Sequence, residues 1–146
     1  MNKAFVKEQE PTGDYCPRCG VRGQVVGAET VNHHVPPAFR QDLSDAAYFC
    51  PTSECEVVYF DMFDRAILAS ALTEPAYPKD STAPICPCFG VTCQDIDRDI
   101  AEGGVMRVRA VLEQAKSPAA QCTQRAVNGR SCVPFVQSYY MRSRAQ

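Results

Sequence analysis

Nine cysteines in a chain of 146 residues constrain this protein more than any other feature of its sequence. Eight of them fall into two sets of four. Each set consists of two pairs, and the two cysteines of a pair are at most ten residues apart in the sequence. In a secreted chain so many cysteines would favour disulfides. The first ten residues, however, contain no apolar stretch that could serve as a secretion signal, and no run approaches the roughly 18 apolar residues of a membrane span. We therefore predict a cytoplasmic protein whose thiols bind metal rather than one another.

The first set consists of Cys16, Cys19, Cys50 and Cys55. A Cys-x2-Cys turn places two sulfurs on one side of the chain, and a second cysteine turn can supply the other two. Four thiolates without a histidine are typical of a closed, structural zinc site. The alternative is a thioredoxin-like redox pair, but Gly20 and Gly23 disfavour the helix that such a motif begins. We predict zinc.

The second set consists of Cys86, Cys88, Cys122 and Cys132. One residue between the first two thiols is cramped for a single tetrahedral ion and suits the wider [2Fe–2S] cluster, which takes two thiolates on each iron. Cys88 comes shortly before a predicted helix cap at Thr92, and Cys132 comes at the start of another predicted helix. Two helix N-termini would then face an anionic cluster. A second zinc ion and unrelated buried cysteines are the alternatives. The sequence does not indicate which two cysteines would bind the same iron.

The apolar patterns predict an α+β protein in two parts. The first part is a β-rich zinc-binding module and the second a small helical [2Fe–2S]-binding domain. Prolines 75, 78 and 84 indicate a linker between them. The predicted boundaries are a flexible leader at 1–12, the zinc module at 13–74, the linker at 75–84 and the helical domain at 85–146.

Short-range signals predict the elements within each part. We expect strands at 25–31, running into a helical turn before Pro36-Pro37, at 56–62 and at 66–71. A capping box of Thr92 and Asp95 begins a helix that Gly103 ends. Two more helices are expected at 105–116 and 133–145.

Three thiol or imidazole residues lie outside the two sets. Adjacent histidines point in different directions, so we expect His33 and His34 to be surface or core residues and not ligands of one ion. Cys93 falls at the first position of a predicted helix, where the helix dipole can lower a thiol pKa. We expect a spare surface thiol there, with a role as accessory copper(I) ligand as the alternative.

Charge also divides the chain. From Val105 onward there are seven basic residues and one acidic residue, so the first 104 residues carry 8 basic and 16 acidic side chains. The basic half either offsets the charge of the cluster or provides a docking face for an acidic partner. No basic run with interleaved aromatic residues indicates nucleic-acid binding.

Two stretches carry a resemblance to known families. Ile85-Cys86-Pro87-Cys88-Phe89-Gly90-Val91-Thr92 with Cys122 and Asn128-Gly129-Arg130-Ser131-Cys132 resembles the [2Fe–2S] domain of bacterioferritin-associated ferredoxin. The earlier motifs, Cys16-Pro17-Arg18-Cys19-Gly20 and Tyr48-Phe49-Cys50-x4-Cys55-Glu56-Val57-Val58-Tyr59-Phe60, are similar to the zinc module of CopZ-type copper chaperones. The resemblance covers residues 14–140 and does not extend to the family's copper-carrying heavy-metal-associated domain.

The resemblance implies that the first four cysteines bind zinc and the second four bind the cluster. It also implies one-electron reduction of copper(II) to copper(I), with transient copper(I) binding, for a copper-carrying chaperone or a copper-transporting ATPase. We expect an electron carrier or metallochaperone component rather than a stand-alone enzyme, with no nucleic-acid partner and no membrane insertion. An electron-transfer subunit of a flavin-dependent oxidoreductase and a structural two-zinc interaction module are the alternatives.

Overall fold

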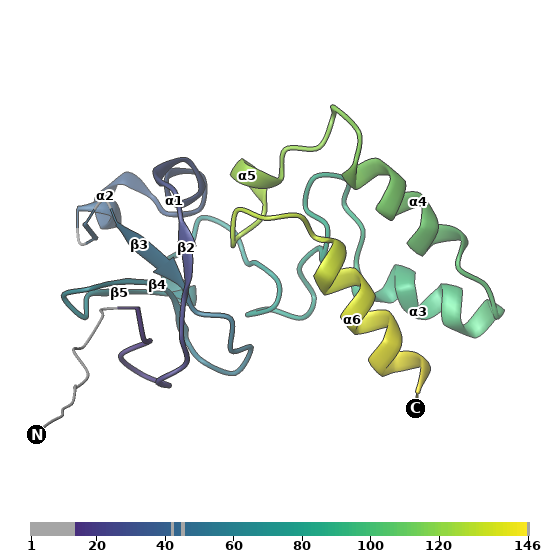
Figure 1. Ribbon diagram of the computed structural model, residues 1–146, viewed down its shortest axis with the longest axis horizontal. Coiled ribbons are helices and arrows are strands. Elements are labelled where there is room, and N and C mark those ends of the chain that lie inside the picture. Colours follow the sequence, from purple (N-terminus) through teal and green to yellow (C-terminus); the bar gives the residue numbers. More distant parts are fainter. Residues whose placement is uncertain (1–13, 42, 45, 146) are drawn as a thin grey trace, which may run out of the picture.

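A four-stranded antiparallel sheet lies at one end of the protein and a group of three helices at the other (Figure 1). The computed structural model describes residues 14–41, 43–44 and 46–145, so the predicted leader at 1–12 lies outside the described residues. The sheet has the order β2-β3-β4-β5, and its strands are Gln24–Val26, Ala47–Phe49, Val57–Asp61 and Ala66–Leu68. The predicted α+β class is confirmed.

Strand β4 is the centre of the first part, and every residue in it is buried. The strand is β-branched and aromatic almost throughout, which suits a pleated surface covered on both sides. Its register shifts between Val57 and Tyr59. Because of this irregularity Val57 and Phe60 pack around the thiols of the first cysteine set, while Val58 and Tyr59 pack into the main core under the sheet.

Short helical segments complete the first part. Helix α1 (Ala28–His34) ends before the proline pair, as predicted, and α2 (Pro37–Arg40) begins within it. The predicted strand at 25–31 is wrong beyond Val26, because Gly27 has extended backbone angles and caps α1. The predicted strand at 66–71 also ends early, and Ala69–Ala71 form a 3-10 turn.

The second part contains the three predicted helices, α3 (Cys93–Glu102), α4 (Met106–Ala115) and α6 (Val133–Arg144). The capping box is present, since Thr92 and Asp95 exchange side chain–backbone hydrogen bonds of 3.0 and 3.3 Å. Gly103 ends α3 with a φ of 77°, the left-handed conformation that glycine adopts most easily. Buried Asp99 of α3 then accepts a 2.7 Å hydrogen bond from the N–H of Val108 in the first turn of α4.

A short helix, α5 (Cys122–Arg125), lies between the two parts and contacts α1 (Figure 1). Sequence patterns did not predict it, because four residues are too few to show a helical period. The segment that follows α5 is buried, and Val127 belongs to the core of the first part. Residues 75–84, expected as a linker, also contribute to packing: Ala76 lies in the core of the first part and Tyr77 packs against that of the second.

Candidate metal centres

The first cysteine turn is shaped by reciprocal backbone hydrogen bonds. The N–H of Cys16 donates to the carbonyl of Val21 at 2.8 Å, and the N–H of Gly20 donates back to the carbonyl of Cys16 at 2.9 Å. Gly20 has a φ of 80°, so its left-handed backbone closes the turn where a side chain would be strained. This geometry leaves the side chains of Cys16 and Cys19 free to face the end of the sheet.

The second cysteine turn joins β3 to β4. Cys50 directly follows β3, and its N–H donates to the carbonyl of Val58 at 2.9 Å. Cys55 closes the loop by donating its N–H to the carbonyl of Thr52 at 3.2 Å. The sheet therefore holds both ends of this turn, and it brings the second pair of thiols opposite the first.

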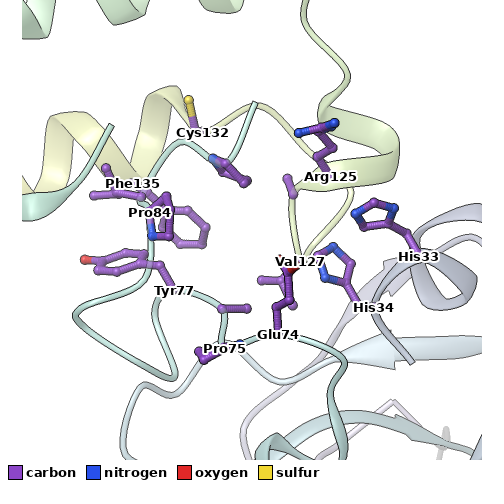
Figure 2. Close-up of a pocket in the computed structure, with 14 residues that line it drawn as sticks. His33, His34, Glu74, Pro75, Tyr77, Pro84, Arg125, Val127, Cys132 and Phe135 are labelled. Carbon is purple, nitrogen blue, oxygen red and sulfur yellow. The ribbon is translucent and has the colours of Figure 1, made fainter. Parts of the chain in front are cut away.

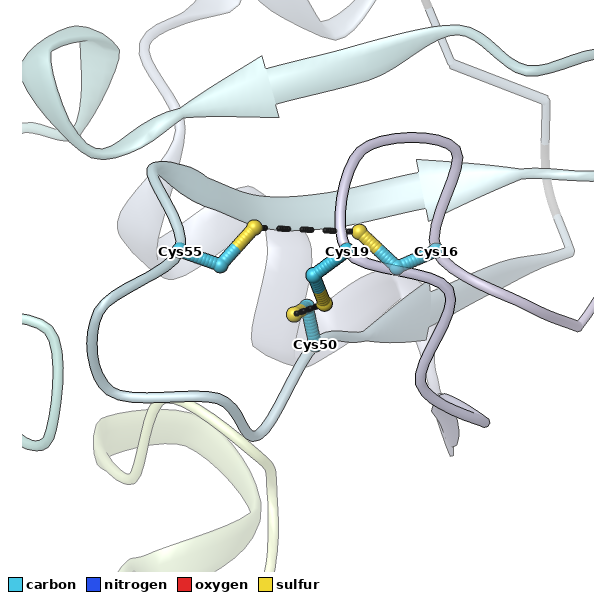
Figure 3. Close-up of side chains that lie close together, drawn as sticks. All are labelled: Cys16, Cys19, Cys50 and Cys55. Carbon is cyan, nitrogen blue, oxygen red and sulfur yellow. Dashed lines mark hydrogen bonds between the residues drawn. The ribbon is translucent and has the colours of Figure 1, made fainter.

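The four sulfurs of the two turns form one compact group (Figure 3). All lie within 4.8 Å of one another, with Cys16 and Cys55 at 3.9 Å and Cys19 and Cys50 at 3.6 Å. Bond lengths of about 2.3 Å in a tetrahedral zinc site require sulfurs about 3.8 Å apart. Cys16, Cys50 and Cys55 are buried, and Cys19 is exposed. The donor set and its spacing fit a closed, structural zinc site with no open position for substrate.

The surroundings favour a negative charge on Cys19. Burial alone would raise the pKa of this thiol, but hydrogen bonds with the Thr52 hydroxyl, the Val21 N–H and the neighbouring thiols outweigh it and lower the pKa to about 6. Burial raises the pKa of Cys50 to about 12 and also raises that of Cys55. A divalent ion would supply the positive charge that lets all four act as thiolates.

Lys79 supports the second turn from a distant part of the chain, a role that no sequence signal indicated. Its ammonium donates to the carbonyl of Thr52 at 2.5 Å and to that of Cys55 at 3.1 Å. The same group lies 5.8 Å from the centre of the Phe49 ring. Its positive charge acts to lower the pKa of Cys50, although burial dominates there. Lys79 thus connects residues 75–84 to the loop that carries two of the thiols.

The second cysteine set lies in the helical part. The turn that begins at Cys86 resembles the turn that begins at Cys16 in its backbone hydrogen bonds and its glycine. Cys86 and Val91 exchange backbone hydrogen bonds of 3.1 and 3.2 Å, and Gly90 has a φ of 72°. The glycine follows the first cysteine by four residues, as Gly20 follows Cys16. Cys88 then points toward α5, and the N–H of Gln121 donates to its sulfur at 3.4 Å.

The thiols of the second set influence one another's charge. Cys132 lowers the pKa of Cys86, and Cys88 raises that of Cys122. Cys132 occupies the N-cap position of α6, as predicted, and its backbone N–H acts to lower the pKa of Cys122. Cys86 and Cys132 are buried, whereas Cys88 and Cys122 are half-buried.

Negative charge in the second set is favoured at Cys86. The hydrogen bond from Cys132 is the main reason, and the N–H groups of Phe89 and Cys88 add to it, so that the pKa of Cys86 falls to about 6 despite burial. The same hydrogen bond, together with burial, raises the pKa of Cys132. Burial and the charge of Cys88 raise the pKa of Cys122.

Cys93 differs from its prediction. The thiol is 8% exposed, so the expectation of a surface thiol is wrong. Burial and the carboxylate of Asp97 raise its pKa, although Arg142 and Tyr139 oppose the shift. The first turn of α3 packs its thiol into the core of the helical part, where desolvation outweighs the dipole.

Among the described residues, no helix is long and apolar enough to cross a membrane. The fold and the first site together define a class: a small antiparallel sheet whose turns carry a four-cysteine structural zinc site. Residues 13–73 match the family of CopZ zinc-binding domains, described as "Zinc binding domain". The match and the group of four thiols support a CopZ-type zinc module in this part of the chain, and with it the predicted zinc.

Two comparisons extend beyond the zinc module. The chain is 34% identical over 82 residues to the copper chaperone CopZ of Archaeoglobus fulgidus, a match that spans 53% of this chain and 38% of that protein. It also shares its fold with the X-ray structure of the Archaeoglobus fulgidus CopZ N-terminal domain, with a TM-score of 0.72 and 24% identity. That likeness covers 85% of this chain and 95% of the solved chain, so the fold of both parts is shared.

Proposed function

We propose that this protein is a cytoplasmic zinc and [2Fe–2S] protein that transfers single electrons in metal homeostasis and reduces copper(II) to copper(I). Cys16, Cys19, Cys50 and Cys55 would hold the zinc ion. Cys86, Cys88, Cys122 and Cys132 would hold the cluster. A copper-carrying chaperone or a copper-transporting ATPase would receive the copper(I).

The spacing of the second set is the observation that carries this proposal. Among the described residues, the zinc-module thiols are the one group of three or more donor side chains whose donor atoms all lie within 4.8 Å. The second set is therefore more widely spaced than the zinc-module thiols, as suits the wider [2Fe–2S] cluster. Its four thiols are enough to give each of two irons two ligands.

The protein around the second set fits an anionic group. The N–H of Gln121 donates to the sulfur of Cys88. The N–H groups of Phe89 and Cys88 act to lower the pKa of Cys86, and that of Cys132 acts to lower the pKa of Cys122. Cys132 also begins α6, so the positive end of this helix faces the site. A cluster bound there would carry one electron, and the reduction of copper(II) to copper(I) needs one electron. The half-buried sulfurs of Cys88 and Cys122 mark the side on which electrons would enter and leave.

Two observations support the assignment to copper and the division into modules. The relative from Archaeoglobus fulgidus is a copper chaperone by name, and its match with this chain reaches beyond the length of the zinc module. Most residues of the helical core are separate from the cores around the sheet, which supports the proposed units at 13–74 and 85–146, although Ala76 of the linker at 75–84 and Val127 belong to the main sheet core.

Metal analysis tests the cluster. Protein purified without oxygen should contain one zinc, two irons and two acid-labile sulfides per chain, and its red-brown absorbance should bleach with dithionite. Zinc in both sites, with no iron and no sulfide, would support the two-zinc module instead.

Reduction of copper tests the activity. Dithionite-reduced protein, freed of excess reductant, should regain its oxidised spectrum when copper(II) is added without oxygen. One copper(I), trapped by a copper(I)-specific chelator, should form for each cluster oxidised. A cluster that reoxidises no faster with copper(II) than without it would refute the copper assignment and leave a redox subunit of a flavoenzyme as the better reading.

A further inference from the structure

A cavity of about 130 Å³ lies between the sheet part and the helical part. Figure 2 shows His33 and His34 on one side of it, at the end of α1, with Glu74 and Val127 beside them and Arg125 above. Cys132 and Phe135 of α6 lie on the opposite side. The cavity therefore adjoins one of the proposed cluster ligands without including the zinc site.

Both imidazoles of the chain line this one cavity. Their ring centres are 4.8 Å apart and the rings are nearly perpendicular, at 78°. The sequence indicated that adjacent histidines would point in different directions. At the last turn of α1, however, the chain leaves the helix toward Val35, and both rings face the same space. Exposed Glu74 places a carboxylate at the edge of this space.

His34 has a buried nitrogen that needs a partner. Among the described residues, its Nε2 is buried and has no hydrogen-bond partner. A buried polar nitrogen without a partner costs about 1–3 kcal/mol. Burial and the neighbouring His33 lower the pKa of His34 to about 4, although the Ala126 and Arg125 backbone and the Glu74 carboxylate oppose the shift, so the ring is neutral at physiological pH. A neutral imidazole nitrogen without a donor to accept from is a ready metal ligand.

We propose that His33, His34 and Glu74 form a transient site for a divalent transition-metal ion, copper(II) in particular, in the cavity between the two parts. Imidazole and carboxylate donors suit copper(II), which binds most nitrogen and oxygen sites more tightly than its neighbours in the first transition row. Copper(I) prefers sulfur, so an ion reduced here would lose its preference for the site. The donor set thus favours copper(II), the ion before reduction, over copper(I), the ion after reduction.

The geometry favours weak, reversible binding of the ion over tight binding. The three donor atoms do not all lie within 4.8 Å, so binding requires the exposed side chains of His33 and Glu74 to rotate toward His34. The guanidinium of Arg125 also lines the cavity and repels a cation. Both features weaken the affinity, as a substrate ion requires. Only the fate of the ion rests on the proposed function; its binding does not.

Copper(II) alone is the probe for this site. One equivalent is added without oxygen to the full-length protein with its cluster oxidised, and electron paramagnetic resonance and competition with glycine report the donors and the affinity. We expect nitrogen hyperfine structure from imidazole. His34→Asn should lower the affinity more than about tenfold, since even indirect supports of a metal ligand have effects of that size. His33→Gln and Glu74→Gln, at exposed positions that folding tolerates, should each lower it less.

Two control variants complete the test. Glu113→Gln removes an exposed carboxylate on α4, away from the cavity, and should leave the affinity unchanged. Arg125→Gln should raise the affinity for copper(II), because it removes a positive charge from the cavity. If the cavity instead binds anions, this variant should not bind copper(II) more tightly. Unchanged binding in all three donor variants, or a spectrum of sulfur donors alone, would overturn the proposal. Iron and sulfide are measured on the same samples, so that loss of the cluster and loss of copper(II) binding are told apart.

Discussion

The hydroxyl of Tyr59 donates a 2.6 Å hydrogen bond to the carbonyl oxygen of Val127. Tyr59 lies at the centre of strand β4, and Val127 lies in the segment between Cys122 and Cys132. Both residues belong to one buried core, and burial keeps the tyrosine protonated by raising its pKa. The sheet that carries the zinc-module thiols therefore supports the segment between two of the proposed cluster ligands.

Removing this hydroxyl tests the support. Tyr59→Phe leaves the Val127 carbonyl without its partner and should destabilise the protein by about 1–3 kcal/mol. Cluster absorbance should also decay faster during mild denaturation, at unchanged zinc content. Tyr48→Phe is the matched control: this ring stacks on Phe60 near the first cysteine set, and its change should stay within about 0.5 kcal/mol. Equal effects of the two substitutions would argue against a special role for Tyr59.

Zinc removal should unfold the sheet part. Cys50→Ser replaces a buried thiol at the end of β3, and four ligands are needed to close the site. We expect loss of zinc and of the near-ultraviolet circular dichroism of the buried aromatic residues, because the binding free energy of a structural zinc ion is largely folding free energy. Wild-type protein treated with a strong chelator should show the same change. A folded, zinc-free Cys50→Ser protein would contradict this view.

Lys79 should act as an indirect support of the zinc site. Lys79→Met keeps most of the apolar stem but removes the donor to the Thr52 and Cys55 carbonyls. We expect zinc affinity to fall about tenfold to a hundredfold, measured by competition with a chromophoric chelator. The exposed residue Glu113 again offers a control, since Glu113→Gln changes charge without touching this loop. Zinc affinity equal to the wild type in Lys79→Met would show that the two carbonyls need no donor.

Asp61 should contribute stability that depends on pH. Its fully buried carboxylate accepts hydrogen bonds from the N–H groups of Ser44, Phe63 and Arg65 and from the Arg65 side chain, at 2.9–3.1 Å. Burial alone would raise the pKa of Asp61, but these donors outweigh it and lower the pKa. The stabilisation is therefore complete above the unfolded pKa of about 3.9 and is lost as the pH falls through the lower folded-state pKa.

The variant Asp61→Asn checks this sign. At neutral pH it should be less stable than the wild type by about 1–3 kcal/mol in urea unfolding. The difference should shrink as the pH falls below about 4, because the unfolded wild type then binds a proton that the folded carboxylate takes up only at lower pH. Acid also releases zinc from both proteins, so the comparison uses the difference between them at each pH. A difference that grows toward acid pH would mean that the folded-state pKa is raised.

Cys93 should be dispensable for metal binding. Cys93→Ala should leave zinc, iron and cluster absorbance unchanged, because the thiol belongs to neither set. In the wild type it should react slowly with iodoacetamide, since it is buried and its pKa is raised. Loss of cluster absorbance in Cys93→Ala would mean that the proposed ligand set is wrong. Rapid labelling of Cys93 in the folded protein would contradict its burial.

Local sequence determined much of this protein. The spacing of Cys16, Cys19, Cys50 and Cys55 predicted the group of four thiols, and Thr92 with Asp95 predicted the start of α3. In each case a few neighbouring residues specify a turn or a cap, whose geometry hardly depends on the rest of the chain. The ligands of the second set stay a prediction.

Tertiary structure alone decided the relationships between distant segments. Lys79 contacts the loop that carries Cys50 and Cys55, Val127 lies in the core of the sheet part, and Cys93 is buried although we expected a surface thiol. His33 and His34 at the end of α1 share one cavity with Arg125 of α5, which packs against α1. Such contacts depend on how whole elements pack against one another, and packing depends on shape and burial summed over residues far apart in the chain.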